Sequence, residues 1–185
     1  MSGKSYQKNT LSLSLTKRYA TVIEILLLIL TGVFITTLRA YLRIPLNIPG
    51  RHGIEVIGIL MAARILSGQK FASSITMLAS GSMMLLPFMG FKDPTIPFMY
   101  MGIGFALDFV WAKFDLKTKN AYIVAFFGGL CYMMIPLLRL GLHFSGLVFI
   151  SSFAKHGIII PILSHFFFGA LGTLVAFGAI KALKK

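Results

Sequence analysis

One long apolar run of the chain, residues 19–42, reads YATVIEILLLILTGVFITTLRAYL. At about 1.5 Å per residue, a helix of this length would rise about 36 Å, enough to cross a hydrocarbon layer of about 30 Å. The apolar residues are continuous rather than alternating, which favours a helix over a barrel strand. The run is too long for the core of a signal peptide, so we predict a retained first span after a polar, basic segment over residues 1–18.

Five further apolar segments follow, over residues 54–66, 71–88, 97–114, 121–142 and 157–183. They predict an all-α integral membrane protein: a compact bundle of six transmembrane helices, forming one domain over residues 1–185. The first of these five is short and would rise only about 20 Å, so it either crosses the membrane or enters it from one side. Hydrophobic side chains make up 57% of the chain, which excludes the soluble and disordered classes.

The basic residues indicate an orientation for this bundle. Lys and Arg outnumber Asp and Glu 18 to 5. Six spans would place both termini on one side, and that side would carry twice as many basic residues as the other. Because Lys and Arg favour cytoplasmic loops, both termini are predicted to be cytoplasmic. The positive charge is therefore interpreted as a sign of membrane orientation, and no nucleic-acid partner is expected.

The opposite, outer side carries the longer loops, with prolines and glycines that give them shape. Basic groups gather there while acidic ones are few, and an arginine fork can hold a carboxylate or phosphate with two hydrogen bonds. Arg139 and His143 share one helix face by their spacing. The alternative is that these arginines, Arg39 and Arg43 included, extend to lipid phosphates. The candidates for a ligand site on this side are Arg51, His52, Arg139, His143 and His156.

Catalytic and metal motifs are not recognisable in the sequence. The four histidines lack the spacing of paired zinc ligands, and the carboxylates that would complete a site are sparse. We therefore predict no metal, no cofactor and no enzymatic activity, and an energy source for any uphill transport would have to be another chain. His165 is expected to form a hydrogen bond between helices.

Two carboxylates lie inside the predicted helices. Asp108 is expected to pair with Arg64 or Lys113, with a proton-relay role as the alternative. Glu24 is expected either to interact with nearby basic residues at the start of the first helix or to contact a partner; the sequence does not choose between these.

Small residues recur every fourth position in several segments. They occur in the first segment and in the last, where Gly169 precedes Thr173 and Gly172 precedes Ala176. Such stripes let helices approach closely, so most are expected to pack within the bundle. A contact face for a larger membrane partner is the alternative.

Two stretches resemble the substrate-binding S components of energy-coupling factor (ECF) transporters. LRIPLNIP, residues 42–49, is similar to the segment that closes the first helix in vitamin-binding members. IGILMAARILSG, residues 57–68, is similar to their second helix, with its small residues and closing glycine. The likeness covers the whole chain in topology and about 40 residues in sequence.

This resemblance implies a bacterial cell (cytoplasmic) membrane and three kinds of partner: a small-molecule nutrient, a transmembrane coupling subunit and two cytoplasmic ATPase subunits. It implies that the binder takes its substrate from outside and topples in the membrane to release it. The family's substrate zone adds Asn47, Lys92 and Tyr100 to the candidate site residues. The family's docking stripe on the first helix corresponds to Gly32, Thr36 and Ala40, although here the stripe lies in the outer half.

The sequence therefore predicts the substrate-binding membrane subunit of an ECF-type vitamin or micronutrient importer. It would capture a small anionic nutrient from the outer face, with arginine binding the charge and aromatic groups covering the rest. Two alternatives are an integral-membrane enzyme acting on a lipid or isoprenoid phosphate, and a structural membrane subunit without a ligand.

Overall fold

The computed structural model describes residues 3–42, 48–146 and 157–184, and these are all helical or loop, with no strand. Two short 3-10 turns, Pro87–Met89 and Leu116–Thr118, flank the fourth helix. The α-helices are α1 (Gly3–Tyr41), α2 (Gly53–Leu66), α3 (Ala72–Met84), α4 (Ile96–Lys113), α5 (Ala121–Phe144) and α7 (Ile159–Leu183). The prediction of an all-α chain is confirmed for the described residues.

The third helix is shorter than predicted. We expected it to extend to residue 88, but α3 ends at Met84 and Pro87 opens a 3-10 turn. Proline has no backbone N–H to continue a helical ladder, and Gly90 then turns the chain with a φ of 74°. The apolar run in the sequence continues beyond the helix because three apolar residues follow it, and these are exposed: Leu85, Leu86 and Phe88.

Three helical segments are long and apolar enough to cross a membrane: Arg18–Tyr41, Ala121–Phe144 and Ile159–Leu183. They indicate an integral membrane protein. The helices α2 and α3, at 14 and 13 residues, rise only about 20 Å each. A count of six complete crossings therefore remains a prediction.

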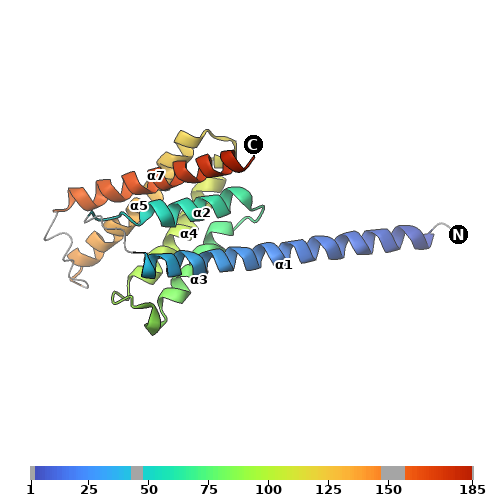
Figure 1. Ribbon diagram of the computed structural model, residues 1–185, viewed down its shortest axis with the longest axis horizontal. Helices are drawn as coiled ribbons and strands as arrows, with labels where there is room; N and C mark the ends of the chain where they lie inside the picture. Colours follow the sequence, from blue (N-terminus) through green and yellow to red (C-terminus); the bar gives the residue numbers. More distant parts are fainter. Residues whose placement is uncertain (1–2, 43–47, 147–156, 185) are drawn as a thin grey trace.

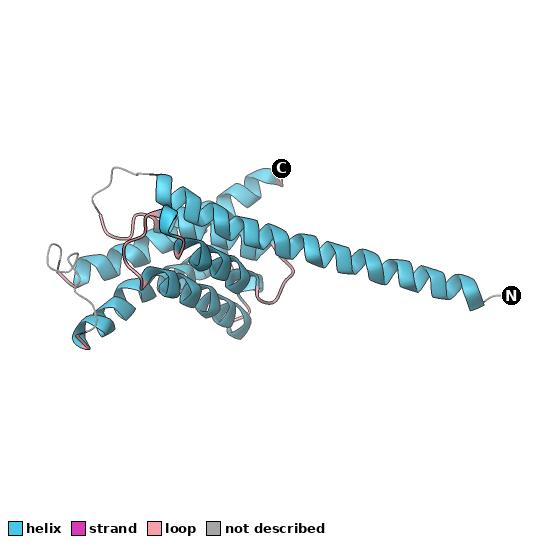
Figure 2. Ribbon diagram, turned by 90° about the horizontal axis from the view of Figure 1, so that it is seen from below, coloured by secondary structure: helices cyan, strands magenta, loops and turns pink. Residues whose placement is uncertain are grey.

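The helices form a bundle from which the first part of α1 projects (Figure 1). After a turn of 90° about the horizontal axis, α1 is seen to lie along one edge of the bundle (Figure 2). Neighbouring pairs are α5 with α7, α2 with α7, α3 with α4, and α1 with α3. The first turn of α1 and the last turn of α7 extend towards the same end of the bundle (Figure 1).

Small residues bring α5 and α7 into close contact. A side chain on Gly128 would collide with Thr173, and one on Gly129 would collide with the backbone of Phe166. A side chain on Gly169 would likewise meet Tyr132. These residues therefore pack within the bundle, as expected for most of the small-residue stripes.

The stripe predicted to dock a partner on the first helix is occupied by α3, which corrects that expectation. A Cβ on Gly32 would lie 2.1 Å from the carbonyl oxygen of Thr76. Thr36 is fully buried and donates from Oγ1 to the carbonyl oxygen of Ser80, at 2.8 Å. Ala40 continues the stripe half-buried. The small side chains serve the contact between α1 and α3, so this face is closed to another protein.

The bundle has two ends with different polar groups. We call the end where α1 finishes and α2 begins the cavity end, and the end where α2 finishes and α3 begins the opposite end. At the opposite end, Asp108 accepts hydrogen bonds from the backbone N–H groups of Ser73 and Ser74, at 3.2 and 2.7 Å, and from the Ser74 hydroxyl. It also pairs with Arg64, whose Nε lies 3.4 Å from its Oδ1. This confirms the predicted pairing of Asp108 with Arg64.

Glu24 ties α1 to the connection between α2 and α3 at the same end. Its carboxylate accepts from the Ser67 hydroxyl and the Gly68 N–H, both at 2.6 Å. It also accepts from the Gln69 side-chain amide at 2.7 Å. Neither sequence alternative named this contact, because the loop that Glu24 grips lies more than 40 residues further along the chain.

Candidate ligand-binding site

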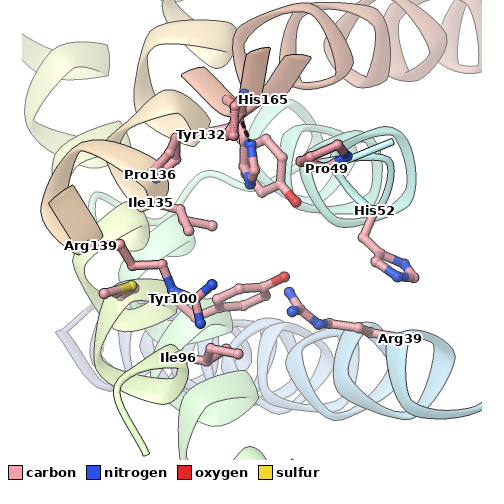
Figure 3. A pocket seen from close by; sticks show the side chains of 13 residues that line it. Arg39, Pro49, His52, Ile96, Tyr100, Tyr132, Ile135, Pro136, Arg139 and His165 are labelled. Atoms are coloured by element: carbon pink, nitrogen blue, oxygen red, sulfur yellow. Dashed lines mark hydrogen bonds between the residues drawn. The ribbon is translucent and has the colours of Figure 1, made fainter. Parts of the chain in front are cut away.

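A cavity of about 190 Å³ lies at the cavity end of the bundle. Its lining comes from the end of α1, the loop before α2, the first half of α4, the second half of α5 and the start of α7. Figure 3 shows ten of these side chains labelled around the open space. Segments far apart in the sequence thus meet at one hollow.

Arg39 supplies the cation of this cavity from the last turn of α1. Its guanidinium carbon lies 4.7 Å from the ring centre of Tyr100 and 5.6 Å from that of Phe91. Across the described residues, Arg39 forms no ion pair with a carboxylate. A guanidinium held by aromatic faces keeps its hydrogen-bond donors available, so Arg39 can receive an anion.

Arg139 approaches from α5, on the other side of Tyr100 in the view of Figure 3. It pairs with Asp93, which lies in the connection before α4. Thr95 orients this carboxylate through its backbone N–H at 2.9 Å and its hydroxyl at 2.6 Å. Burial would raise the pKa of Asp93, but these hydrogen bonds and the charge of Arg139 outweigh it, so its pKa lies below the ordinary value. Asp93 therefore stays ionised and fixes Arg139.

His165 presents a hydrogen-bond acceptor to the cavity. Its Nδ1 lies 2.6 Å from the carbonyl oxygen of Pro161, one turn earlier in α7. A carbonyl can only accept, so Nδ1 carries the proton and the neutral ring keeps a lone pair on Nε2. The expected hydrogen bond between helices is therefore wrong: the partner is within the same helix. The ring packs against Tyr132, with the ring centres 5.0 Å apart.

Two tyrosine hydroxyls complete the polar lining. Tyr100 is fully buried, and its hydroxyl has no hydrogen-bond partner among the described residues. Figure 3 shows the hydroxyl oxygens of Tyr100 and Tyr132 directed towards the open space. A buried hydroxyl without a partner is costly and uncommon. Such a group in a cavity wall is suited to bind a ligand atom.

The loop before α2 closes one side of the cavity and depends on glycine to do so. Gly50 adopts a φ of +79°, and a Cβ there would lie 2.7 Å from Nδ1 of His165. A Cβ on Gly53 would lie 2.5 Å from a ring carbon of Tyr132. The backbone can therefore press against both rings only because these side chains are missing. Pro49 and His52 reach the cavity from the same loop.

His52 is positioned by Glu55, one turn into α2. Its Nδ1 is in hydrogen-bond contact with Oε1 of that carboxylate. Burial lowers the pKa of His52 below its ordinary value of 6.5, although the hydrogen bond to Glu55 acts in the other direction. At neutral pH the ring is therefore uncharged, and the charge at this wall of the cavity comes from arginine.

Pro136 interrupts α5 where the helix lines the cavity. Proline has no N–H to donate to the carbonyl of Tyr132, four residues earlier. The helix therefore loses one bond of its ladder between its glycine-rich part, which is packed against α7, and the turn that carries Arg139.

The structure collects some of the predicted site residues and not others. His52, Tyr100 and Arg139 line the cavity, whereas Arg51, Lys92 and His143 do not. Asn47 and His156, together with Arg43 and Lys155, lie outside the described residues.

Three lining residues were missed by the sequence reading: Arg39, Tyr132 and His165. Arg39 was weighed as part of the outer basic cluster, with a contact to lipid phosphates as the alternative, and was not placed among the site candidates. Tyr132 and His165 lie mid-helix in apolar runs that look like ordinary core. Proline and glycine clustered near residue 50 were the one available sign that a loop would fold back over these rings.

Comparisons with known proteins add no relative: no protein-family model, no curated protein and no solved structure matches the chain. Within the described residues, no group of three or more His, Cys, Asp or Glu side chains lies close enough to hold a metal ion. The chemical groups that line the cavity therefore have to indicate its function. The cavity offers the guanidinium of Arg39, which has no ion pair in the described structure, the guanidinium that Asp93 fixes, two tyrosine hydroxyls and the imidazoles of His52 and His165.

Proposed function

We propose that the chain is the substrate-binding membrane subunit of an ECF-type importer, and that it captures a small anionic nutrient in this cavity. The observation that supports the proposal is Arg39, a cation in the cavity wall that has aromatic neighbours but no carboxylate among the described residues. An anion would supply the missing counter-charge and accept charge-assisted hydrogen bonds. The arrangement favours a binder over a structural subunit packed solid with side chains.

The size of the cavity limits the ligand. A volume of about 190 Å³ corresponds to roughly six water molecules at about 30 Å³ each. This is below the range of roughly 300–1,000 Å³ that is typical for drug-sized ligands. We therefore expect the polar part of the ligand to be a single small acidic group with few attached atoms.

The remaining parts of the proposal come from the resemblance. The cavity end would face outwards, and the opposite end, towards which both chain ends extend, would face the cytoplasm of a bacterium (Figure 1). A transmembrane coupling subunit and two ATPases would drive release. Their docking face must lie elsewhere than the stripe of Gly32 and Thr36, because α3 covers it.

The test is mass spectrometry of small molecules that co-purify with the protein in detergent. Wild type is compared with Arg39→Met, which keeps the apolar bulk of the side chain and removes its charge. Lys117→Met is the matched control, since Lys117 is exposed in the short turn before α5. An anion should be retained by wild type and control, and be at least about tenfold depleted in Arg39→Met, as expected for a lost charge-assisted hydrogen bond. Equal retention in all three proteins rejects the proposal.

The alternative of an enzyme acting on a lipid or isoprenoid phosphate is favoured by one observation. His52 and Glu55 form a contact beside the cavity, and Oε2 of Glu55 is buried without a partner in the described structure. Such a pair could exchange a proton with a bound ligand. Release of phosphate or alcohol from a lipid phosphate by pure wild type, lost in Glu55→Gln, would favour the enzyme; no turnover would favour the binder.

A further inference from the structure

A second hollow lies beside the cavity, as a groove of about 520 Å³ between α4 and α5. Its walls are almost wholly apolar: Phe98, Met99, Leu137, Leu138, Gly141 and Leu142. Phe98 is 63% exposed, and Leu137 and Leu138 are 42% and 45% exposed. The groove is therefore open along the side of the bundle, where the surrounding medium is hydrocarbon.

The groove and the cavity are neighbours in the fold. Met99 lines both of them. On α5, Ile135 and Arg139 line the cavity, while Leu138 and Leu142, three residues further along in each case, line the groove. Residues three apart on a helix are adjacent on its surface. Met99 therefore stands between the two spaces, and joining them requires this unbranched side chain, with its three rotatable bonds, to change its rotamer.

From this adjacency we propose that the ligand is amphiphilic, with an acidic head in the cavity beside Arg39 and a hydrocarbon tail in the groove between α4 and α5. The inference rests on the proposed function, because it takes the cavity to be the site of an anion. It adds the class of substrate: an aliphatic monocarboxylate. Phe98, an aromatic side chain suited to cover the apolar part of a ligand, lies in the groove wall.

The charges of the cavity favour a carboxylate head over a phosphate. Arg139 is already matched by Asp93, whereas Arg39 has no carboxylate partner among the described residues. The charge of Glu55 acts on Arg39 electrostatically, but no carboxylate of the described residues occupies its donors directly. A guanidinium fork binds the two oxygens of a carboxylate in one plane, which suits a head with a single negative charge. A phosphate monoester carries between about 1.5 and 2 negative charges at neutral pH and would exceed the available counter-charge.

Glycine in the groove allows a direct test. A Cβ on Gly141 would meet no atom within 4 Å, so Gly141→Phe can fill the groove without displacing the protein. Gly178, on α7, is equally free of neighbours and does not line either hollow. Gly178→Phe is therefore the matched control, because it adds the same ring to another helix.

The experiment is equilibrium dialysis of radiolabelled butanoate and decanoate against the full-length protein in detergent. Four proteins are compared: wild type, Gly141→Phe, Gly178→Phe and Arg39→Met. Each methylene group taken from water into an apolar site strengthens binding about fourfold. Wild type and Gly178→Phe should therefore bind decanoate more than about tenfold tighter than butanoate. Gly141→Phe should lose at least about tenfold of that preference and bind butanoate within about twofold of wild type, since only the tail is displaced.

The outcomes separate the inference from the proposed function. Should butanoate bind through Arg39 while Gly141→Phe keeps the preference for decanoate, the groove does not hold the tail and only the inference is wrong. Binding of decanoate that needs Gly141 but not Arg39 marks a mere lipid contact and overturns the two-part ligand. If Arg39→Met binds both probes as wild type does, both proposals are rejected. If no protein binds either probe, the class of aliphatic monocarboxylates is wrong, and the retention of another anion in the co-purification experiment decides the proposed function separately.

Discussion

The two ends of the bundle differ in how their charged groups are paired. At the opposite end, Asp108 has three hydrogen bonds and an ion pair, and Glu24 has three hydrogen bonds. At the cavity end, Arg39 has only aromatic faces, and the hydroxyl of Tyr100 has no partner in the described structure. Both ends bury polar groups at a cost, and each keeps buried atoms without a hydrogen-bond partner in the described structure: Nε of Arg64 and Oγ of Ser73 at the opposite end, and the hydroxyl of Tyr100 at the cavity end. The ends differ in their arginines, since Arg64 is matched by Asp108 whereas Arg39 has no ion pair among the described residues.

The largest effect is expected from Asp108→Asn. The substitution leaves Arg64 buried without its counter-charge and turns an amide towards the N–H groups at the start of α3. Loss of one partner from a buried pair costs about 3–5 kcal/mol, so thermal unfolding in detergent should shift strongly downwards. Asp115→Asn is the control, because Asp115 is exposed in a loop. Equal, small shifts for both would show that the opposite end does not hold the fold.

Gly50→Ala tests whether the loop must press against His165. Alanine disfavours the φ of +79°, and its methyl group would collide with the imidazole. We expect a loss of about 2–4 kcal/mol in stability, from overpacking added to backbone strain. Gly90→Ala provides the control: its φ is +74° but no atom lies within 4 Å, so it should lose only about 1 kcal/mol. Matching losses in the two variants would mean that the loop does not close the cavity.

Two hydroxyl deletions compare the ends directly. Ser74→Ala removes a hydrogen bond to the charged Asp108 and should destabilise the protein by about 1.5–3 kcal/mol. Tyr100→Phe removes a hydroxyl without a partner, so stability should stay unchanged or rise by up to about 1 kcal/mol, while ligand retention falls. The measurements are the thermal midpoint and the amount of co-purified anion. A destabilised Tyr100→Phe would show that its hydroxyl is already satisfied.

The smallest effect concerns pH and the pair of Asp93 with Arg139. The pKa of Asp93 lies below its ordinary value of 3.8, so its contribution to stability is complete above that value and is lost as the pH falls through the lower, folded pKa. The carboxylate is 27% exposed, which limits the contribution to about 1 kcal/mol or less. Below about pH 4 the thermal midpoint of wild type should approach that of Asp93→Asn. A difference that persists there would mean that another group titrates.

The helices were largely predictable from the sequence, because apolar runs bounded by glycine, proline and charge fix where each helix begins and ends. Most predicted ends lie within two residues of those observed. Two ends were exceptions: α1 begins at Gly3 rather than near residue 19, because a helix can continue into a polar segment, and α3 ends at Met84 although the apolar run continues to residue 88. The pair of Asp108 and Arg64 was also predicted, because buried opposite charges have few other partners.

The cavity was predictable only in part. His52 and Arg139 were found because charged and polar groups inside a membrane bundle are costly and therefore mark candidate sites, and Tyr100 was found through the resemblance. Arg39, Tyr132 and His165 were not, since their roles depend on which helices are neighbours, and a single sequence does not contain that information. The prediction for the stripe of Gly32 and Thr36 was wrong for the same reason: small residues indicate a close helix contact but not which helix or protein forms it.

The missing ladder bond at Pro136 has a mechanical consequence. The part of α5 before it packs closely against α7 through Gly128 and Gly129, whereas the part after it carries Arg139, which pairs with Asp93 in the loop before α4. The helix therefore lacks one bond of its ladder at the wall of the cavity, between these two contacts. A bend at Pro136 would move Arg139 relative to Tyr132, so the position of this guanidinium depends on the angle of the proline-containing helix.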